Sequence, residues 1–290
     1  MTDLFHSEHA IDFERRFGGV RRLYGTAAFE RFQRAHVCVI GIGGVGAWTA
    51  EALARTAIGR LTLIDADHLA ESNINRQIHA LTHELGKSKV EAMKARIHAI
   101  NPRCQVSCVD AFLTPENVAG LLVESFDYVV DAIDSARAKT ALIVHCRRQR
   151  ISLVCVGAAG GQTDPGRVQL ADLARTTEDP LLSKVRASLR REHGFPREPG
   201  KKFGVDCVYS TEPPLPRSTD TIPAFSSSFN RLESSAGDMR GTPRLRSLKR
   251  VVPQSSSRMT NGVQREQNTS AAIETGQNCP YPLRSGIGDP

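Results

Sequence analysis

The sequence is poor in paired cysteines and in aromatic residues, and both shortages exclude classes of protein. No Cys-x-x-Cys pair occurs, and the seven cysteines are an odd number. A disulfide framework and a zinc site with four thiolate ligands are therefore both disfavoured. Aromatic residues make up only 6% of the chain, which is too few for an obvious surface on which nucleic-acid bases could stack.

A long apolar run is also missing. The longest charge-free stretch of apolar character covers residues 35–50 and contains four glycines. It falls short of the roughly eighteen continuous apolar residues that indicate a membrane span. The first six residues lack a basic region followed by an apolar core, so we expect no cleaved signal peptide. These absences predict a cytoplasmic protein without stable membrane insertion.

The composition divides the 290 residues into a globular part and a tail. Apolar residues account for 40% of the chain, which is enough to form a core. After Glu212 the composition changes, because residues 213–290 hold nine of the fifteen prolines and two runs of three serines. No apolar periodicity survives there. We therefore expect a low-complexity, disordered tail over residues 213–290.

Short apolar runs alternate with segments of helical length from residue 35 to about residue 157. The candidate strands are 36–40, 61–64, 105–109, 128–130 and 153–156, and the candidate helices are 44–58, 87–100, 115–124 and 136–150. This alternation predicts an α/β fold with a doubly wound, mostly parallel sheet. We assign residues 1–157 to a Rossmann-like nucleotide-binding core. Residues 158–212, with a candidate strand at 167–170 and a candidate helix at 180–191, form a substrate-facing extension of the same domain.

A glycine-rich loop joins the first candidate strand to a helix. Its glycines are Gly41, Gly43, Gly44 and Gly46, in the register G-x-G-x-x-G. Such a loop offers backbone N–H groups and a helix N-terminus to a phosphate. A tight turn without a ligand is the alternative, but it does not require three glycines in this register. Asp65 ends the second strand, where a carboxylate would bind ribose hydroxyls. These features fit any nucleotide, including NAD(P).

Polar side chains after the second strand narrow the choice of nucleotide. Asp67, Asn73, Arg76 and Lys89 follow in order, with Asn75 and Lys87 between them. A hydride-transfer enzyme has no use for this cluster, whereas a triphosphate needs cations and amide donors. Each residue alone could belong to a polar loop or to an exposed helix face. Taken together, they predict ATP.

Two carboxylates, Asp131 and Asp134, end the fourth candidate strand. At the carboxyl edge of a parallel sheet they would face the triphosphate and could bind Mg²⁺ through oxygen atoms. Either carboxylate could instead cap the next helix, and Asp134 is the better placed of the two for this role. We predict that Asp134 binds the metal.

These motifs together resemble the E1-like superfamily of adenylating enzymes. Within it, the chain is most similar to the tRNA threonylcarbamoyladenosine dehydratases, and this narrower resemblance covers about residues 14–212. It rests on the segments 16–25, 77–81, 160–165 and 204–212. After residue 212 that family continues with an apolar Gly- and Ala-rich segment that ends in a hydrophobic helix. This chain instead has Pro-, Ser- and Arg-rich sequence there.

The resemblance implies ATP-dependent cyclisation of the threonylcarbamoyl group on A37 of tRNA, through an acyl-adenylate. It implies that the loop glycines hold phosphates, that Asp65 holds the ribose, and that Asp67 lies in the same site. Asn73, Arg76 and Lys89 would contact the triphosphate, and Asp134 would bind Mg²⁺. Arg76 and Asp134 are the implied catalytic residues.

The resemblance also implies a homodimer, tRNA as a partner, and a sulfur-transfer or cysteine desulfurase protein as a second partner. The sequence offers several basic clusters for tRNA, although each could be an ordinary solvated face. They are Arg147–Arg148, Arg150, Lys184, Arg186, Arg190–Arg191 and Lys201–Lys202. Two alternative functions stay open. One is adenylation of a ubiquitin-like sulfur carrier, and the other is an NAD(P)-binding module.

Overall fold

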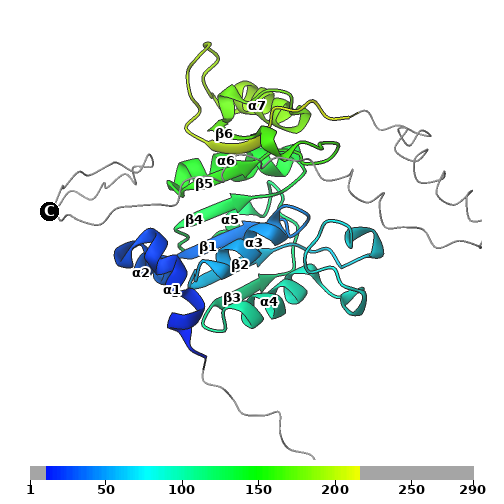
Figure 1. Ribbon diagram of the computed structural model, residues 1–290. Coiled ribbons are helices and arrows are strands. Elements are labelled where there is room, and N and C mark those ends of the chain that lie inside the picture. Colours follow the sequence, from blue (N-terminus) through cyan, green and yellow to red (C-terminus); the bar gives the residue numbers. More distant parts are fainter. Residues whose placement is uncertain (1–10, 216–290) are drawn as a thin grey trace, which may run out of the picture. The chain divides into compact units, whose positions relative to one another are not determined.

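The computed structural model describes residues 11–215, which build one sheet of seven strands (Figure 1). The strands are β1 (His36–Ile40), β2 (Arg60–Ile64), β3 (Gln105–Val109), β4 (Tyr128–Asp131), β5 (Leu153–Val156), β6 (Val168–Asp172) and β7 (Asp206–Ser210). Their order is β3-β2-β1-β4-β5-β7-β6, and only the pair β6 and β7 is antiparallel. The order reverses between β1 and β4, as it does in doubly wound folds. The predicted α/β class is confirmed.

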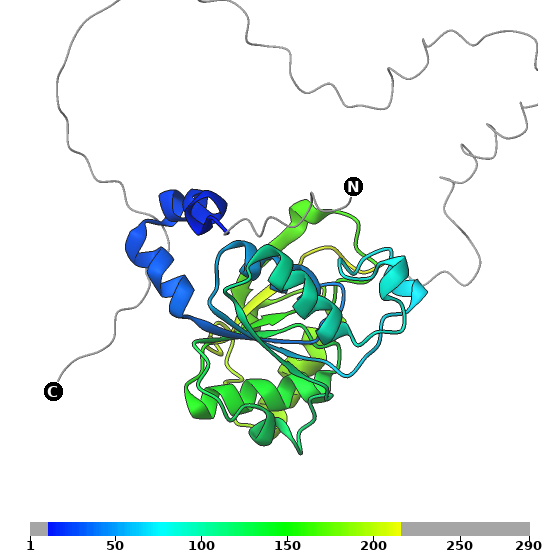
Figure 2. The same ribbon diagram turned by 90° about the horizontal axis from the view of Figure 1, so that it is seen from below.

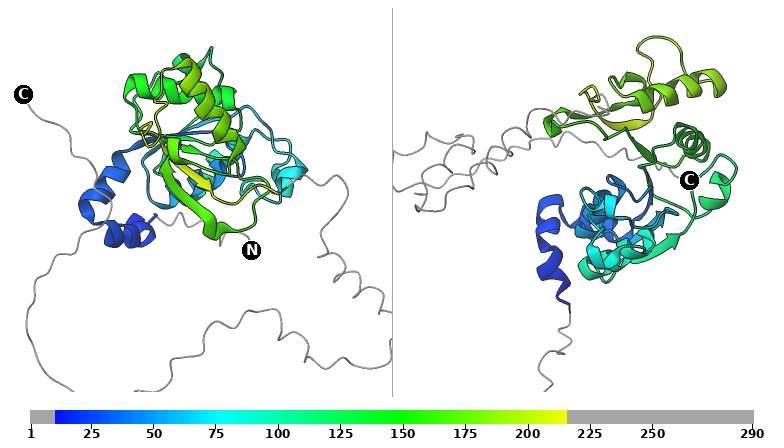
Figure 3. Two further views of the ribbon diagram at one scale, coloured as in Figure 1. Left: turned by 90° about the horizontal axis from the view of Figure 1, so that it is seen from above. Right: turned by 90° about the vertical axis from the view of Figure 1, so that its right-hand side faces the viewer.

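Helices cover both faces of the sheet. On one face lie α3 (Gly46–Arg55) and α4 (Lys89–Ile100), and on the other lie α5 (Val118–Leu121), α6 (Ala136–Gln149) and α7 (Pro180–Glu192) (Figure 3). The strand β1 is apolar throughout because its side chains alternate between the two cores. Val37 and Val39 pack toward α3, and Cys38 and Ile40 pack toward α6.

Five of the candidate strands occur within one residue of their predicted ends, and 167–170 contributes to β6. The candidate helix at 115–124 is only the single turn α5. The sequence analysis did not predict the paired helices α1 (Phe13–Tyr24) and α2 (Thr26–Arg34), nor the strand β7. Figure 2 shows α1 and α2 beside the sheet, where they pack on a small cluster of Phe17, Phe29 and Ala57.

Residues 158–212 add β6, β7 and α7 to the same sheet and core. The boundary at residue 157 stays a prediction. The predicted disordered tail lies, from residue 216 onward, outside the described residues. Between residues 11 and 215, no helix combines the length and apolar character that a bilayer crossing requires.

Candidate nucleotide-binding site

A cavity of about 800 Å³ lies at the carboxyl edge of the sheet, beside the point where the strand order reverses. Open α/β sheets bind ligands at this place. The structure brings nearly all the predicted site residues to its wall, namely Gly41, Gly43, Gly44, Asp65, Asp67, Asn73, Arg76, Lys89 and Asp134. Gly46 is the exception, because it begins α3 just behind the loop. The roles of these residues in catalysis and binding stay predictions.

The loop glycines divide into those that the fold needs and those that it does not. Gly41 has a φ of +87°, and a Cβ there would lie 2.7 Å from the carbonyl oxygen of Ala132. A Cβ on Gly46 would lie 1.8 Å from the carbonyl oxygen of Gly41. Gly43 has no atom within 4 Å of its Cβ position. Packing within the chain does not require a glycine at Gly43, so the open space beside it is available to a ligand.

The backbone of this loop is ready to donate hydrogen bonds. Among the described residues, the N–H groups of Gly43, Gly44 and Val45 find no acceptor. No side chain caps the N-terminus of α3. Unsatisfied N–H groups at a helix N-terminus form an anion site, because the helix dipole adds to their partial positive charge.

Asp65 fixes the shape of the loop. One carboxylate oxygen accepts a hydrogen bond from the N–H of Ile42 at 2.6 Å, and the other accepts from the N–H of Asp67 at 2.8 Å. The side chain is nearly buried and lines the cavity. Each oxygen keeps a second lone pair, so the carboxylate can also accept a ligand hydroxyl.

Lys89 and Asp67 form an ion pair at 2.6 Å. The Lys89 side chain is only 7% exposed, whereas the Asp67 side chain is 52% exposed. The lysine is therefore held at the cavity wall by a partner that itself faces water. Asn73 is held in a similar way, since its side-chain oxygen accepts from the N–H of Ala70 at 3.0 Å.

Arg76 lies across the glycine loop. Its guanidinium donates to the carbonyl oxygen of Ser72 at 2.7 Å and to the side-chain oxygen of Asn75 at 2.9 Å. No carboxylate in the described part of the chain neutralises it. The indole N–H of Trp48 donates to the backbone carbonyl of Arg76 at 3.0 Å, which ties the arginine to α3. Sequence analysis missed Trp48, because nothing in the motif marks it.

The two carboxylates after β4 have different roles. Asp131 is fully buried, and Lys139 lies 2.8 Å from it with equally complete burial. Burial alone lowers the pKa of Lys139, but the adjacent Asp131 carboxylate raises this pKa above its usual value. Lys139 therefore stays charged. Asp131 is thus a buried partner of Lys139, and it does not line the cavity.

Asp134, in contrast, is exposed and lines the cavity. Ser135 caps α6, since its hydroxyl accepts from the N–H of Ala138 at 3.4 Å. The alternative role of Asp134 as the helix cap is thus taken by its neighbour. Residues 11–215 contain no cluster of three or more metal-ligating side chains. One free carboxylate still fits Mg²⁺, because this ion commonly takes one or two carboxylates and completes its shell with phosphates and water.

His79 lies near the charge of Lys89, a residue of the cavity wall, and is 2% exposed. Neither ring nitrogen has a hydrogen-bond partner among the described residues. Burial lowers the pKa of His79 to about 4, and the nearby charges of Lys89 and Arg96 add to this effect. The imidazole is therefore neutral at physiological pH. The sequence analysis did not identify His79 as a functional or structural residue.

Two carboxylates organise residues 158–215, and one of them reaches the cavity wall. Asp179 accepts from the N–H of Ala158 at 2.8 Å and from the N–H of Leu182 at 2.9 Å, so it holds a cavity wall and caps α7. Glu212 accepts from the N–H groups of Thr163 and Asp164, both at 2.9 Å. The segments 160–165 and 204–212, which are far apart in sequence, meet through this contact.

Comparison with known proteins agrees with this geometry. The model of the ThiF family matches residues 18–210. A tRNA threonylcarbamoyladenosine dehydratase of Escherichia coli is 52% identical over 214 residues, which cover 73% of this chain and 80% of the relative. The dehydratase of Haemophilus influenzae is 50% identical over 202 residues, which cover 70% and 77%.

A solved structure extends the comparison to three dimensions. The crystal structure of the E. coli tRNA N6-threonylcarbamoyladenosine dehydratase in complex with ATP matches with a TM-score of 0.69 and 52% identity. The match covers 71% of this chain and 85% of that one. The family model, the relatives and the shared fold lead to one conclusion: the chain belongs to the ThiF family, and it is similar to the tRNA threonylcarbamoyladenosine dehydratases within it.

Proposed function

We propose that this protein uses ATP to dehydrate and cyclise the threonylcarbamoyl group on A37 of tRNA. The observation that carries the proposal is the cavity, which is lined by eight predicted nucleotide contacts from separate parts of the chain and by the predicted metal ligand Asp134. The similarity to dehydratases at about half identity supports the same reaction. The ATP in the solved relative supports ATP as the nucleotide.

The chemistry needs an activated carboxylate, because a carboxylate oxygen is a poor leaving group. A carboxylate oxygen of the substrate attacks the α-phosphorus of ATP, and the bond to the bridging oxygen of the β-phosphate breaks. The products are an acyl-adenylate and pyrophosphate. The neighbouring carbamoyl group then attacks the acyl carbon, loses a proton and expels AMP. No covalent attachment to the enzyme is required, so the protein mainly positions its substrates and neutralises charge.

Each cavity residue takes a role that suits its surroundings. The N–H groups of Gly43 and Gly44 hold phosphate oxygens, and Asp65 binds the ribose. Arg76 stabilises the charge that develops on the departing pyrophosphate, because no carboxylate within residues 11–215 neutralises its guanidinium.

Lys89 and Asn73 contact the triphosphate, and Asp67 holds Lys89 in place until the nucleotide arrives. Asp134 would hold Mg²⁺, which would supply further positive charge to the leaving group.

The alternative functions have less support. A sulfur-carrier adenylating enzyme would be expected to carry paired zinc-binding cysteines, which this sequence lacks. An NAD(P)-binding module leaves Arg76, Lys89 and Asp134 without a ligand to bind.

The cysteines agree with a reaction that needs no covalent attachment to the enzyme. Burial raises the pKa of Cys104 to about 11 and that of Cys146 to about 12, so these thiols are poor nucleophiles.

Three further parts of the proposal concern partners and location. We propose a homodimer, to which the exposed apolar side chains of Leu23, Tyr24 and Trp48 would contribute buried surface. We also propose a sulfur-transfer or cysteine desulfurase protein as a partner, on the family resemblance alone. Because the substrate is tRNA, the proposed place of action is the cytoplasm.

The test is direct. Purified protein is incubated with ATP, Mg²⁺ and tRNA that carries threonylcarbamoyladenosine, and the nucleosides are analysed by mass spectrometry. We expect loss of one water from the modified nucleoside, with release of AMP and pyrophosphate.

Arg76→Ala should lower turnover about a hundredfold, because a cation that stabilises transition-state charge contributes on the order of 3 kcal/mol. Arg34→Ala, on exposed α2, is the matched control. No ATP-dependent loss of water, or tighter binding of NAD than of ATP, would contradict the proposal.

A further inference from the structure

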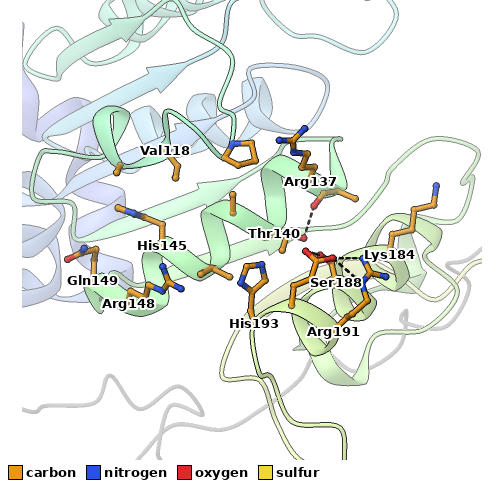
Figure 4. A pocket seen from close by; sticks show the side chains of 16 residues that line it. Val118, Arg137, Thr140, His145, Arg148, Gln149, Lys184, Ser188, Arg191 and His193 are labelled. Carbon is orange, nitrogen blue, oxygen red and sulfur yellow. Dashed lines mark hydrogen bonds and ion pairs between the residues drawn. The ribbon is translucent and has the colours of Figure 1, made fainter.

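A second hollow, of about 880 Å³, lies between α6 and α7 and is bordered by α5 (Figure 4). We call it the α6–α7 groove. Its floor consists of small and apolar side chains, among them Ala136, Ala141 and Val144 on α6 and Val118 on α5. No Phe, Tyr or Trp lines the groove, and its rings are the imidazoles of His145 and His193. Most of its polar lining consists of charged side chains at the rim, which we consider next.

The rim is strongly positive. Four cations and one carboxylate line the groove, namely Arg137, Arg148, Lys184, Arg191 and Glu192. Arg137 pairs with Glu116, and Arg191 pairs with Glu192. Arg148 and Lys184 have no ion-pair partner between residues 11 and 215, and both are exposed. A groove with two unneutralised cations fits an anionic ligand.

The groove begins where the nucleotide cavity ends. Ser135 lines the cavity and the next residue, Ala136, lines the groove. Leu181 lines the cavity, and Lys184 lies one turn further along α7 in the groove. Both helices start at the cavity edge, because Ser135 caps α6 and Asp179 joins the cap of α7 to the cavity wall. A ligand in the groove is thus adjacent to a ligand in the cavity.

The cations are spread along the groove. The fourteen residues of α6 extend over about 21 Å at 1.5 Å per residue. Arg137 and Arg148 are separated by about 16 Å along this axis, and Lys184 and Arg191 by about 10 Å along α7. One small anion cannot reach all of them. A chain of regularly spaced anions can.

We propose that the α6–α7 groove binds the sugar–phosphate backbone of the tRNA beside the nucleotide whose modified base enters the cavity. The inference rests on the proposed function, which brings an RNA substrate to the cavity. Phosphate contacts position a nucleic acid and carry no sequence information, which suits a rim of spread cations. The hydroxyl of Ser188 and the amide of Gln149 also line the groove and can bond ribose 2′-hydroxyl groups.

The other basic residues of this region have structural roles, which separates them from the groove. Arg147 donates to the carbonyl oxygen of Phe203 at 3.0 Å and stacks on the ring of Phe195. Arg190 donates to the carbonyl oxygen of Pro196 at 3.2 Å and lies over the ring of Phe203. Of the basic residues that the sequence offers for tRNA binding, Arg148, Lys184 and Arg191 line the groove.

The experiment compares two double variants with equal changes in net charge. Arg148→Gln with Lys184→Gln removes the unpaired groove cations. Arg34→Gln with Lys94→Gln removes exposed cations from α2 and α4, away from the groove. Binding of tRNA to the full chain is measured over a range of salt concentrations, and binding of ATP is measured beside it.

We expect the groove variant to bind tRNA about tenfold more weakly than the wild type at moderate salt. The slope of log K against log salt should fall by roughly one to two, since two phosphate contacts are lost. The control should bind tRNA like the wild type, and ATP affinity should be unchanged in both variants.

The outcomes separate this inference from the proposed function. A wild type that binds no tRNA even at low salt would contradict both. If the wild type binds and converts tRNA while the groove variant binds as tightly, the function stands and the groove assignment is wrong. Equal competition by a polyglutamate peptide would also overturn the assignment, since it would indicate an acidic protein as the partner.

Discussion

The nucleotide cavity and the α6–α7 groove lie side by side, yet their polar groups are organised in opposite ways. In the cavity, Asp65, Asn73 and Arg76 already make hydrogen bonds to the chain, at 2.6 to 3.0 Å. In the groove, Arg148 and Lys184 project into solvent without ion-pair partners among the described residues. Chemistry benefits from groups that are fixed before the reaction, whereas binding to a flexible polyanion tolerates mobile charges. The comparison therefore separates a site for reaction from a surface for attachment.

The helix α6 belongs to both sites, and a substitution inside it gives the largest expected effect. Lys139→Met would leave the Asp131 carboxylate buried without its cation. Breaking a buried pair on one side costs about 3–5 kcal/mol, so the free energy of unfolding should fall by this amount. Urea denaturation measures it.

The double variant Lys139→Met with Asp131→Leu is the control for this substitution. It should recover much of the loss, because no isolated charge remains buried. A loss below about 1 kcal/mol in the single variant would show that Asp131 does not depend on Lys139 for its burial.

The glycine loop offers a second contrast, between folding and binding. Gly46→Ala should destabilise the protein by about 3 kcal/mol or more, because the new methyl group would collide with the carbonyl oxygen of Gly41. Gly43→Ala should leave the thermal unfolding temperature nearly unchanged, since its Cβ meets no atom within 4 Å. Calorimetric titration should nevertheless show weaker ATP binding. Wild-type ATP affinity in Gly43→Ala would place the phosphates elsewhere.

A third substitution tests the metal at the border between the two sites. Asp134→Asn should lower Mg²⁺-dependent turnover at least about tenfold, because a neutral amide is a poorer ligand for this hard cation. Stability should change little, since Ser135 and not Asp134 caps α6. Ser135→Ala is the matched control, and it should cost about 1 kcal/mol of stability with metal dependence preserved. The metal assignment fails if Asp134→Asn keeps the wild-type response to Mg²⁺.

The sequence predicted the structure best where one physical constraint, such as burial or a required glycine, acts on residues that are neighbours in the chain. Short apolar runs predicted β1 to β5. They are clearest in the central strands β1, β2 and β4, whose residues are nearly all buried. The glycine register predicted the turn into α3. The strand β7 was not predicted, because it begins with the charged residue Asp206. In addition, its short pattern of residues indicates a strand only when the partner strand β6 is known. Its pairing with β6 is a tertiary contact.

The site shows the same limit. Residues that follow a strand could be assigned to the cavity, since the carboxyl ends of parallel strands share one edge. Asp131 and Asp134 both lie at the end of the fourth candidate strand, so the sequence does not separate their roles. The buried Lys139 identifies Asp131 as the structural carboxylate and leaves Asp134 as the exposed one. Asp179 reaches the cavity wall from the start of α7, at a separation of 21 residues from Ala158. A single sequence contains no local signal for such a contact.

The last expected effect concerns His79, close to Lys89 on the cavity side of the comparison, and it develops gradually as the pH changes. Its pKa is about 4 in the folded protein, against about 6.5 when unfolded, so the unfolded state binds more protons between these values. Stability is therefore lost as pH falls through this range, by up to about 1.4 kcal/mol per pH unit. From about pH 7 to about pH 5, the wild type should lose about 2 kcal/mol more than His79→Gln. Urea denaturation at each pH measures the difference.

His36 and His145, whose pKa values burial also lowers, remain in both proteins, so their contributions to the pH dependence cancel. Parallel stability curves for wild type and variant would show that His79 titrates freely, and that the cavity wall is not closed to protons.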